Sequence, residues 1–434
     1  METKKFRIFV PFLSLVLLGA GIFAHLPLYA QAVSGDLFGA VMDASGASVP
    51  DAAVTAINPE TGLRIGTATN ARGEYRFSNL PAGRYSLFVV ASGFAKATTT
   101  GVAVQLNQTA TANIALQVAS AAITMEVTEA GPGLDTTTAQ IQNTYGAKQS
   151  EDLPVTGMGL GVLNLSLLGA GVASSGGVGV GSGPSVGGQR PRNNNFTVDG
   201  VDDNNKQATG PTVVIPNDSV AEFSLLQNQF LAEYGHSSGG QFNTVVKGGT
   251  NQFRGTLYEY LENRELNAVD QSFANQGTYS LPRFDQNRLG GNYAGPILRD
   301  KLFFFTSFEY NPLGQSSTSP GQIFAPAAGG YATLASVPGV NPTNLAVMKQ
   351  YATASAVTPG APALLVNGKS IPTGLIPVVA PNYTNNYFGV TSLDYNISPN
   401  DQLRGRYIFN RTNQIDTGAE LPLFYTSGVT QNRP

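Results

Sequence analysis

The sequence predicts an all-β dominated chain: an N-terminal β-sandwich, then a mixed domain, then the first strands of an incomplete transmembrane β-barrel. Three observations lead to this prediction. An export signal opens the chain, strand and turn signals alternate at short intervals over residues 35–118, and apolar and polar residues alternate along several segments after residue 250. Alternation of this kind is typical of strands with two different faces.

The export signal sets the compartment of the protein. Basic residues within the first seven positions precede an apolar run over residues 8–24, and small residues follow at Ala30 and Ala32. This order is typical of a cleaved signal peptide, which we assign to residues 1–32, with an uncleaved anchor helix as the alternative. No later segment of the sequence reaches the roughly 18 consecutive apolar residues that a membrane helix needs. A mature chain that spans a membrane must therefore do so as a closed barrel.

The composition excludes several classes of function. Charged residues make up only 12% of the chain, about half of the usual share in soluble domains. The net charge of -3 offers no electrostatic footprint for nucleic acid. Cysteine is absent, which removes thiol catalysis, cysteine metal sites and disulfides together.

Residues 33–118 have the pattern of a small β-sandwich, because short strand candidates are separated by turn signals. The strand candidates are Leu37–Val41, Ala53–Ile57, Arg64–Thr69, Glu74–Phe77, Tyr85–Val90, Val102–Leu106 and Thr111–Leu116. The turn signals are Asp43–Gly46, Asn58–Gly62, Asn70–Gly73 and Pro81–Gly83. All are rich in residues whose backbone or side-chain geometry favours turns.

The same region resembles the carboxypeptidase regulatory-like domain over its whole length. The matching residues are Gly39-x-Val41-x-Asp43, Val49-Pro50, Thr69-Asn70-x-x-Gly73-x-Tyr75, Leu80-Pro81-Ala82-Gly83-x-Tyr85 and Gly93-Phe94. A zinc carboxypeptidase site needs several histidine and glutamate ligands, but the chain has two histidines, of which His25 lies in the signal peptide and leaves only His236. The resemblance therefore implies a fold and no catalysis, and we expect no catalytic residue, metal or cofactor.

Residues 119–251 resemble the linker and plug domain of TonB-dependent outer-membrane receptors. The matching segments are Leu153–Val155, Gly188–Asn205, Val220–Phe223 and Phe230–Gly255, the last of which looks like the junction of plug and barrel. A regulatory-like sandwich before a plug resembles the Oar-like branch of that family. The chain departs from the family where His236 replaces a common Arg and where Gly248 or Gly249 replaces a common Ser.

Residues 252–434 read as the N-terminal part of an outer-membrane β-barrel. In residues 402–410 one face carries Leu403, Gly405, Tyr407 and Phe409, and the other carries Gln402, Arg404, Arg406 and Asn410. Apolar-out and polar-in alternation is what a transmembrane strand requires. Residues 387–397 and 288–293 alternate in the same way, residues 301–310 are apolar on both faces, and residues 256–261 are supported mainly by the family resemblance.

Loop lengths predict the topology of this barrel. Segments 295–300 and 398–401 are short, and segments 263–285 and 311–386 are long. Outer-membrane barrels have short periplasmic turns and longer extracellular loops, so we expect the sandwich and plug on the periplasmic side. About five strands are recognisable, against the roughly 22 of plugged transporters. We therefore expect the chain to be an N-terminal portion of a longer receptor.

Two groups of residues are candidates for functional sites. The segment before the plug resembles a Ton box, the peptide that pairs with the energy-transducing protein TonB; it comprises Ile123, Thr124, Met125, Glu126 and Val127. Strand addition depends on backbone hydrogen bonds, so its sequence can be loose; a last sandwich strand or a linker is the alternative. Arg190 and Arg192 are weak candidates for substrate contact, with barrel-facing salt bridges as the alternative.

Other motifs favour structural interpretations. Asp199, Asp202 and Asp203 lack the spacing of a calcium loop, and Asp199-Gly200 is a strong hairpin turn. The run 177–181 lacks the Lys and helix start of a phosphate loop. The acids Glu126, Glu129, Glu151 and Asp152 are typical of a surface, and the aromatic residues of segment 303–310 are expected to include part of a membrane girdle rather than a carbohydrate platform.

The family resemblance implies an outer-membrane receptor that imports a ligand through a barrel gated by its plug. The expected partners are a TonB-type protein, outer-membrane lipid and an extracellular ligand of the siderophore, oligosaccharide or peptide class. The alternative is a surface adhesion protein that uses the sandwich as a binding module. An enzyme is the least favoured class, because the mature chain has one histidine and no cysteine.

Overall fold

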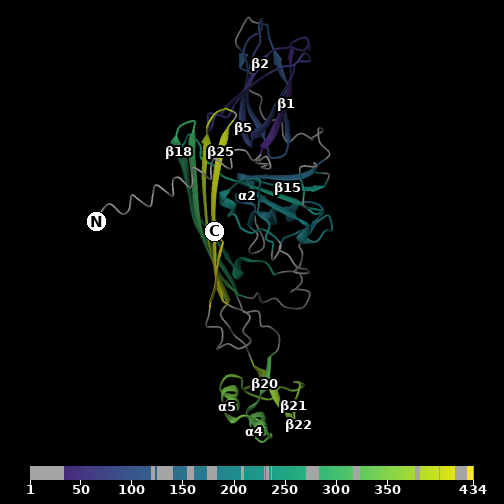
Figure 1. Cartoon of the computed structure of the whole chain (residues 1–434), viewed down its shortest axis with the longest axis vertical. Helices are drawn as coiled ribbons and strands as arrows, with labels where there is room; N and C mark the ends of the chain where they lie inside the picture. Colours follow the sequence, from purple (N-terminus) through teal and green to yellow (C-terminus); the bar gives the residue numbers. More distant parts are fainter. Residues whose placement is uncertain are drawn as a thin grey trace, which may run out of the picture.

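The computed structural model describes residues 34–118, 123–124, 140–153, 161–173, 183–206, 210–228, 230, 234–235, 237–269, 283–315, 323–376, 382–399, 401–415 and 428–433. Figure 1 shows the β-sandwich at one end of the long axis and a small α/β lobe at the other. The barrel sheet and the plug lie side by side between them. The predicted signal peptide lies outside the described residues.

The sandwich consists of two facing sheets around one apolar core. One sheet has β4, β1 and β7 in order, with β8 also paired to β1, and the other has the order β3-β2-β5-β6-β9. The strands are β1 Ser34–Asp43, β2 Ala53–Ile57, β3 Arg64–Ala68, β4 Glu74–Pro81, β5 Gly83–Val90, β6 Ala97–Val104, β7 Thr109–Thr111, β8 Ile114–Leu116 and β9 Ile123–Thr124. Leu37, Val54 and Leu87 meet in the core and are fully buried.

The predicted turns of the sandwich are confirmed, and side-chain oxygens hold them. Asn58 Oδ1 accepts hydrogen bonds from the backbone of Glu60 and Thr61, and Asn70 Oδ1 accepts from Arg72 and Glu74. One strand was predicted too late: β6 begins at Ala97, whereas the sequence placed it from Val102 to Leu106. The threonine-rich start of β6 carries little apolar signal, and Gly101, at φ 79°, lies where the pairing of β6 with β5 shifts register.

The plug has a mixed sheet in the order β10-β15-β16-β13-β14. Its strands are β10 Ile141–Gly146, β15 Val220–Asn228, β16 Gln241–Val246, β13 Asn195–Val198 and β14 Val201–Asp202, and β11 Val172–Ala173 pairs separately with β12 Ser185–Val186. Its helices are α2 Ala147–Asp152 and the 3-10 turns η1 Gly161–Leu168, η2 Pro191–Asn193 and η3 Asn217–Ser219. Phe196, Phe223 and Phe242 form its aromatic centre.

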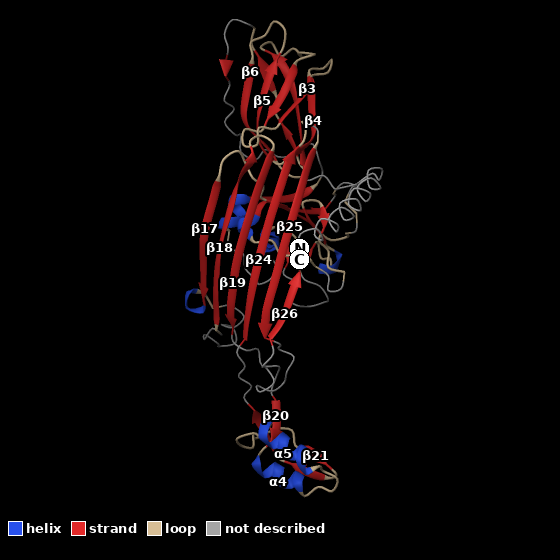
Figure 2. Ribbon diagram, turned by 60° about the vertical axis from the view of Figure 1, so that its left-hand side comes forward, coloured by secondary structure: helices blue, strands red, loops and turns tan. Residues whose placement is uncertain are grey.

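The barrel region is one antiparallel sheet in which strands follow one another in chain order (Figure 2). In the described part of the chain the strands are β17 Arg254–Asn263, β18 Phe284–Leu298, β19 Leu302–Gln315, β24 Asn382–Asn396, β25 Gln402–Ile415 and β26 Gly428–Arg433, with the turn η4 Arg264–Leu266 after β17. The sheet is curved but open, with β17 and β26 at its edges. The short polar strand β26 was not recognised from sequence.

The two faces of this sheet differ as predicted. Leu403 and Tyr407 are exposed on the outer face of β25, whereas Arg406 is largely buried and Asn410 fully buried against the plug. The structure also settles β19, because Phe303 and Phe305 point inward and are buried while Phe308 is 53% exposed on the outer face. Leu257 of β17 is 90% exposed on that face too, so exposed apolar side chains gather on the outer face.

Aromatic side chains gather at two levels of the outer face. Phe253, Tyr293 and Phe304 pack together near the sandwich, with centroid distances of 5.9 Å for the first pair and 5.7 Å for the second. Tyr310 and Tyr387 stack at 4.9 Å nearer the lobe. Phe304 and Tyr310 are roughly 20 Å apart along β19, which suits girdles that flank an apolar band of about 25 Å.

The loops differ strongly in length at the two ends of the sheet. Residues 299–301 and 397–401 join strands at the sandwich end, whereas residues 316–381 lie between β19 and β24. This long connection contains the lobe, which the sequence did not predict. Its elements are β20 Ile323–Pro326, α4 Ala328–Ala335, α5 Pro342–Tyr351, β21 Leu364–Val366, β22 Lys369–Ile371 and β23 Thr373–Ile376.

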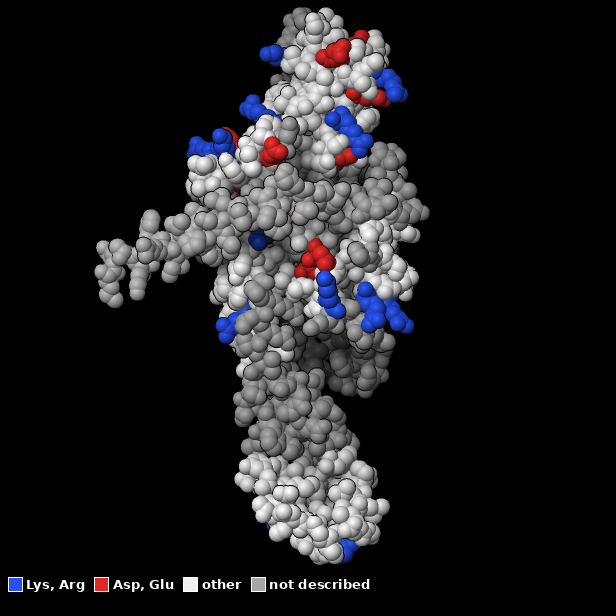
Figure 3. All heavy atoms as spheres, in the orientation of Figure 1, with Lys and Arg blue, Asp and Glu red and all other residues white. Residues whose placement is uncertain are grey.

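The lobe has its own small core and very little charge. Tyr331, Leu334 and Ile371 are buried together, and the Tyr331 hydroxyl donates to the Ala352 carbonyl at 2.6 Å. Residues 323–376 contain two lysines and no acidic residue or arginine, so the lobe is almost uniformly white in Figure 3. Among the helices in the described ranges, none has the length and apolar character needed to cross a membrane.

Candidate functional site

The site with the richest chemistry is the plug–wall interface, which we define as the contact between the plug and the inner face of β17–β25. Its centre is apolar. Phe305 of β19 and Val390 of β24 are buried in the same core cluster as Phe223 and Phe242 of the plug. The plug therefore shares a core with the barrel sheet, which explains why inward positions of these two strands are apolar.

The first ionic anchor joins the plug to β24 and β25. Arg406 forms ion pairs with Asp199 of the plug and, at 2.7 Å, with Asp394 of the neighbouring strand. The other carboxylate oxygen of Asp199 accepts a hydrogen bond from Val246 N at 3.0 Å. The side chains of Arg406 and Asp199 are only 13% and 8% exposed, so water screens this anchor little.

Local structure explains why Asp199 points at the wall. Val198 pairs with Val201 across a two-residue hairpin loop, and both Asp199 and Gly200 have positive φ, at 47° and 75°. This is the type I′ geometry that an Asp-Gly pair favours, so the predicted turn is confirmed. The turn projects the Asp199 carboxylate towards β25 while its backbone stays paired with β16.

The second ionic anchor joins η3 of the plug to β18 and β19. Arg288 Nη2 lies 3.0 Å from Glu309 and 3.6 Å from Asp218 Oδ2, and Tyr260 donates to Asp218 Oδ1 at 3.0 Å. Burial raises the pKa of Asp218 despite the Tyr260 hydrogen bond. Glu309 also accepts from the Tyr258 hydroxyl at 3.1 Å. This anchor is looser than the first, because Asp218 Oδ2 has no hydrogen-bond donor in the described part of the chain.

Uncharged contacts lie between and beyond the two anchors. The amide of Asn410 forms two hydrogen bonds with the backbone of Val214, at 2.6 and 3.1 Å. The hydroxyls of Ser219 and Ser307 lie 2.7 Å apart. Ser392 donates to the Lys247 carbonyl at 2.9 Å. Polar groups of the wall thus pair with polar groups of the plug, which is why inward positions of β25 could be polar without being left unsatisfied.

The segment that joins the plug to the barrel runs very close to the backbone of the barrel sheet. Gly249 lies against the sheet, where a Cβ would overlap the Phe304 carbonyl oxygen and lie 2.8 Å from that of Gly295. A side chain at this position would push the junction off the wall. The family commonly has Ser where this chain has Gly248 or Gly249. If Gly249 is the replaced position, the absence of a side chain there avoids this steric overlap.

The predicted coupling segment begins on the sandwich. Ile123 and Thr124 form β9, which pairs in parallel with Ala97 and Thr98 of β6. Met125, Glu126 and Val127 lie outside the described residues. The structure thus makes the first two residues an edge strand of the sandwich, while their recognition by TonB stays a prediction.

The arginines of the interface are not those singled out from the sequence. Arg190 and Arg192 flank Pro191 in η2, are exposed, and form no ion pair with a described residue. Arg288 and Arg406 make the contacts instead. The alternation of apolar and polar residues predicts that Arg288 and Arg406 lie on the inner face of their strands. Nothing in the sequence indicates which acidic residues they pair with.

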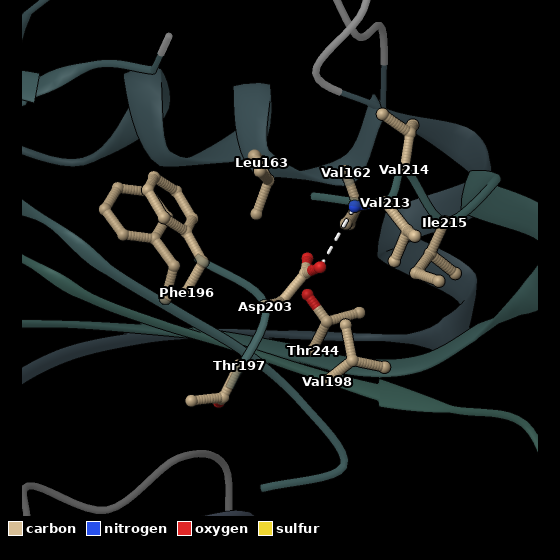
Figure 4. Close-up of a pocket in the computed structure, with 11 residues that line it drawn as sticks. Val162, Leu163, Phe196, Thr197, Val198, Asp203, Val213, Val214, Ile215 and Thr244 are labelled. Atoms are coloured by element: carbon tan, nitrogen blue, oxygen red, sulfur yellow. Dashed lines mark hydrogen bonds between the residues drawn. The ribbon is translucent and has the colours of Figure 1, made fainter. Parts of the chain in front are cut away.

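The cavity between described residues of the plug is too small for a ligand. It has a volume of about 10 Å³ and is lined mainly by apolar residues such as Val162, Phe196 and Ile215 (Figure 4), space for about one water molecule. Asp203 reaches into it and accepts a hydrogen bond from Val213 N at 3.0 Å. Within the ranges that the structure describes, His, Asp and Glu side chains form no group of three that could hold a metal ion.

Glu126 and Glu129 lie outside the described residues, and the described acids Glu151 and Asp202 have structural partners. Glu151 forms an ion pair with Lys247, whose ammonium also donates to the Asp218 carbonyl at 2.9 Å. Asp202 accepts from Asn204 N at 3.1 Å beside the hairpin. The acidic cluster of the sequence is thus divided among separate partners.

Comparison with known proteins agrees with this architecture. Residues 245–434 match the model of an outer membrane beta barrel domain, and residues 36–117 match the carboxypeptidase regulatory-like domain. The TonB-dependent transporter Oar of Myxococcus xanthus is 26% identical over 298 residues, which cover 68% of this chain and 28% of that protein. The chain thus spans about a quarter of the length of this relative.

Solved structures to which the chain shows similarity include an outer membrane transporter and two receptors. The outer membrane transporter YddB from Escherichia coli is 13% identical, the match covers 63% of this chain and 33% of that chain, and the TM-score is 0.39. The siderophore receptor PirA from Acinetobacter baumannii is 15% identical, with coverage of 64% and 32% and a TM-score of 0.39. A mutant of the ferric enterobactin receptor PfeA from Pseudomonas aeruginosa is 15% identical, with coverage of 65% and 34% and a TM-score of 0.40. The sequence relative is named as a transporter. The chain is therefore an outer-membrane homologue of the TonB-dependent transporter Oar, with a carboxypeptidase regulatory-like domain ahead of an outer membrane beta barrel domain.

Proposed function

We propose that the chain forms the sandwich, the plug and the first barrel strands of a TonB-dependent transporter that imports a ligand of the siderophore, oligosaccharide or peptide class. The observation that supports this most is the plug–wall interface. A domain that shares a core with the inner face of a lipid-facing sheet, and is tied to it by Arg288 and Arg406, occupies the place of a stopper. Within the described residues β17 and β26 are the edges of this sheet, and unpaired backbone groups at a sheet edge are costly in lipid.

The interface also suits a stopper that has to move. Its anchors are carboxylates, guanidinium groups and hydroxyls, which exchange their partners for water when the plug shifts as a body. Removing one partner alone would leave a buried charge, whereas separating both hydrates both. Polar anchors therefore allow reversible displacement better than an entirely apolar seal would.

The sidedness follows from the loops. The short turns lie at the end of the sheet that carries the sandwich (Figure 1), and short turns of outer-membrane barrels are periplasmic. The sandwich and the coupling segment then face the periplasm, where a TonB-type protein anchored in the inner membrane reaches them. The lobe lies outside the cell, in the longest described connection.

Binding of TonB tests this function. Strand addition needs the backbone N–H groups of the coupling segment, and proline removes one of them. We expect Val127→Pro to reduce binding of the purified periplasmic domain of a TonB-type protein at least tenfold, while the matched variant Val127→Ala binds like the wild type. Equal binding by both variants would contradict residues 123–127 as the coupling segment.

A measurement of ligand uptake distinguishes the transporter proposal from the adhesion alternative. The transporter proposal predicts that a strain expressing the full-length protein loses its growth advantage on the imported nutrient when the TonB-type protein is deleted. An adhesion protein would keep its phenotype without TonB. Outer-membrane residence alone does not distinguish the two.

A further inference from the structure

The sandwich meets one end of the barrel sheet (Figure 1) through the turn of residues 58–62, which follows β2. This turn is held from within. Asn58 Oδ1 accepts hydrogen bonds from Glu60 N at 2.9 Å and from Thr61 N at 3.2 Å. Gly62 N donates to the Asn58 carbonyl at 2.9 Å. The turn therefore reaches the barrel as a preformed projection of the sandwich.

The rim of the barrel sheet, by which we mean Asn251 before β17 and Asp300 in the turn after β18, forms a seat for this projection. Asn251 Nδ2 donates to Asp300 Oδ1 at 2.7 Å, and Asp300 N donates to Asn251 Oδ1 at 2.8 Å. Asn251 N donates to the Glu60 carbonyl at 2.8 Å, and Arg254 lies 3.4 Å from the Glu60 carboxylate. A Cβ on Gly62 would lie 2.1 Å from Asp300 Oδ1. The turn thus fits its seat closely.

The loop after β6 attaches the sandwich to the plug as well. Leu106 N donates to Glu222 Oε1 of β15 at 2.6 Å, and Gln142 Nε2 of β10 donates to the Leu106 carbonyl at 2.9 Å. Gln108 Nε2 lies 3.4 Å from Thr144 Oγ1 of β10. The sandwich therefore bridges two parts of the molecule, the plug and the rim.

The two attachments differ in their exposure to water. Leu106 and Glu222 are 2% and 8% exposed, whereas the side chains of Arg254 and Glu60 are 57% and 53% exposed. An exposed ion pair shifts an equilibrium by only about fivefold or less, and its groups are already partly hydrated. Parting the sandwich from the plug would expose backbone groups that are now buried and paired. The rim contact is therefore the one that gives way first.

We propose that the turn of residues 58–62 is a latch. Seated on Asn251 and Asp300, it holds the plug in the barrel through the sandwich; once it leaves the rim, the sandwich and the plug move as one unit. This inference rests on the proposed function, since a plug that never moves needs no latch.

The opposite arrangement is a fixed collar, in which the sandwich stays on the rim while the plug moves past it. A collar requires the contact of Leu106 with β10 and β15 to break while the exposed contact of Glu60 survives. The burial of the first contact and the exposure of the second favour the reverse order. The two arrangements make opposite predictions for the contacts that remain when the plug is loosened.

Cross-linking rates show which contact the sandwich keeps, because this chain contains no cysteine of its own. In the full-length protein, Glu60→Cys/Asn251→Cys is the sandwich–rim pair and Gln108→Cys/Thr144→Cys is the sandwich–plug pair. A short bifunctional thiol reagent is applied in detergent to each pair, with and without Arg406→Met. That substitution removes the cation of the first ionic anchor and so loosens the plug from the wall.

We expect Arg406→Met to lower the cross-linking rate of the sandwich–rim pair about threefold or more, since loss of a buried ion-pair partner shifts an equilibrium by well over that factor. The sandwich–plug pair should keep its rate. The control Arg411→Met, on an exposed residue of the same strand, should change neither rate. A sandwich–rim rate that stays at its original value, or a sandwich–plug rate that falls, would overturn the latch.

Hydrogen exchange of the plug strand β16 gives a second readout. In the Arg406→Met protein, closing the sandwich–rim pair with the reagent should slow this exchange about threefold or more, because a closed latch opposes release of the plug just as the lost anchor did. Closing the sandwich–plug pair should leave it unchanged, because those two parts already move together. Equal exchange before and after closure of the sandwich–rim pair would overturn the latch.

These measurements separate the latch from the proposed function. They use neither an imported ligand nor a TonB-type protein, so their failure contradicts the latch alone. Failure of the proposed function would instead appear as a growth advantage that survives deletion of the TonB-type protein.

Discussion

At the scale of single residues, the contact between plug and wall depends on a few buried charges. Arg406 balances two carboxylates, one from the plug and one from its own sheet. Arg288 does the same for Asp218 and Glu309. In both anchors one arginine lies between two acids, so removing the arginine leaves more uncompensated charge than removing either acid.

Arg406→Met should therefore loosen the plug. It leaves Asp199 and Asp394 without a cation in a poorly hydrated space, which costs about 3–5 kcal/mol. Hydrogen exchange of strands β13 and β16 in the detergent-solubilised full-length protein measures the loss. The matched control is Arg404→Met on the same strand, whose side chain is exposed and hydrogen-bonds Gln402; it should change stability by about 0.5 kcal/mol or less. Equal effects of the two variants would contradict the anchor.

Glu222 gives the contact between sandwich and plug a dependence on pH. Burial raises the pKa of Glu222 to about 7 from its ordinary value of 4.5, although Leu106 N partly opposes the shift. Its charged form is thus disfavoured in the docked state. Docking is fully stable below about pH 4.5, weakens as the pH rises, and levels off above about pH 7.

Glu222→Gln should remove this dependence, because the amide keeps an acceptor for Leu106 N and does not ionise. We expect the thermal stability of the wild-type protein to fall between pH 4.5 and 7 more steeply than that of the variant. Scanning calorimetry of both proteins in the same detergent checks this. Parallel curves would show that Glu222 does not set the pH response.

At the scale of elements, alternation assigns each barrel strand two faces with different neighbours. The outer face of β19 carries Phe304, Phe308 and Tyr310, while its inner face carries Phe303, Phe305 and Glu309. Sequence alone could not orient this strand, because both faces are aromatic near its start. Packing against the plug explains the inward aromatic residues, which a strand lining water would lack.

Phe308→Arg tests the lipid-facing assignment. Arginine on the lipid face costs up to about 2–4 kcal/mol near the bilayer midplane and less towards its edges. We expect a smaller folded fraction in outer membranes, seen as loss of the heat-modifiable band in electrophoresis. Phe308→Leu, which keeps an apolar side chain, should fold like the wild type. Tolerance of the arginine would place Phe308 away from lipid.

Some elements follow from the sequence because their signals are local. The turns at Asn58 and Asn70 are held by their own side chains, so a few neighbouring residues determine them. The lobe at residues 323–376 was missed because its short helices and strands lie in a connection without a long periodic pattern. Strand β26 was missed because its sequence, Gly428–Arg433, has almost no apolar residue.

The site was predicted only in part, for a physical reason. Alternation placed Arg288 and Arg406 on the inner face of the sheet, since period two determines direction. It does not determine the partner: Asp199 and Arg406 are 207 residues apart in the chain. Their pairing depends on how the plug sits in the curve of the sheet, which only the folded chain specifies.

At the scale of the whole molecule, three parts hold one another. The sandwich contacts the plug through Leu106 and the rim through Glu60, and the plug shares a core with the wall. A force applied at Thr124, which pairs with β6, would therefore reach the sandwich and the plug before it reached the barrel sheet. The proposed function requires this order of contacts.

The central claim is that the residues ahead of the barrel pack against its inner face in the membrane. The hydroxyls of Ser219 in η3 and Ser307 in β19 are 2.7 Å apart, so the double variant Ser219→Cys/Ser307→Cys of this cysteine-free chain should form a disulfide in isolated outer membranes. The control pair Ser224→Cys/Ser307→Cys, with Ser224 further along β15, should stay reduced. A cross-link in the first pair alone is the predicted result; no cross-link in either pair, in protein shown to be folded in the outer membrane, would contradict the account.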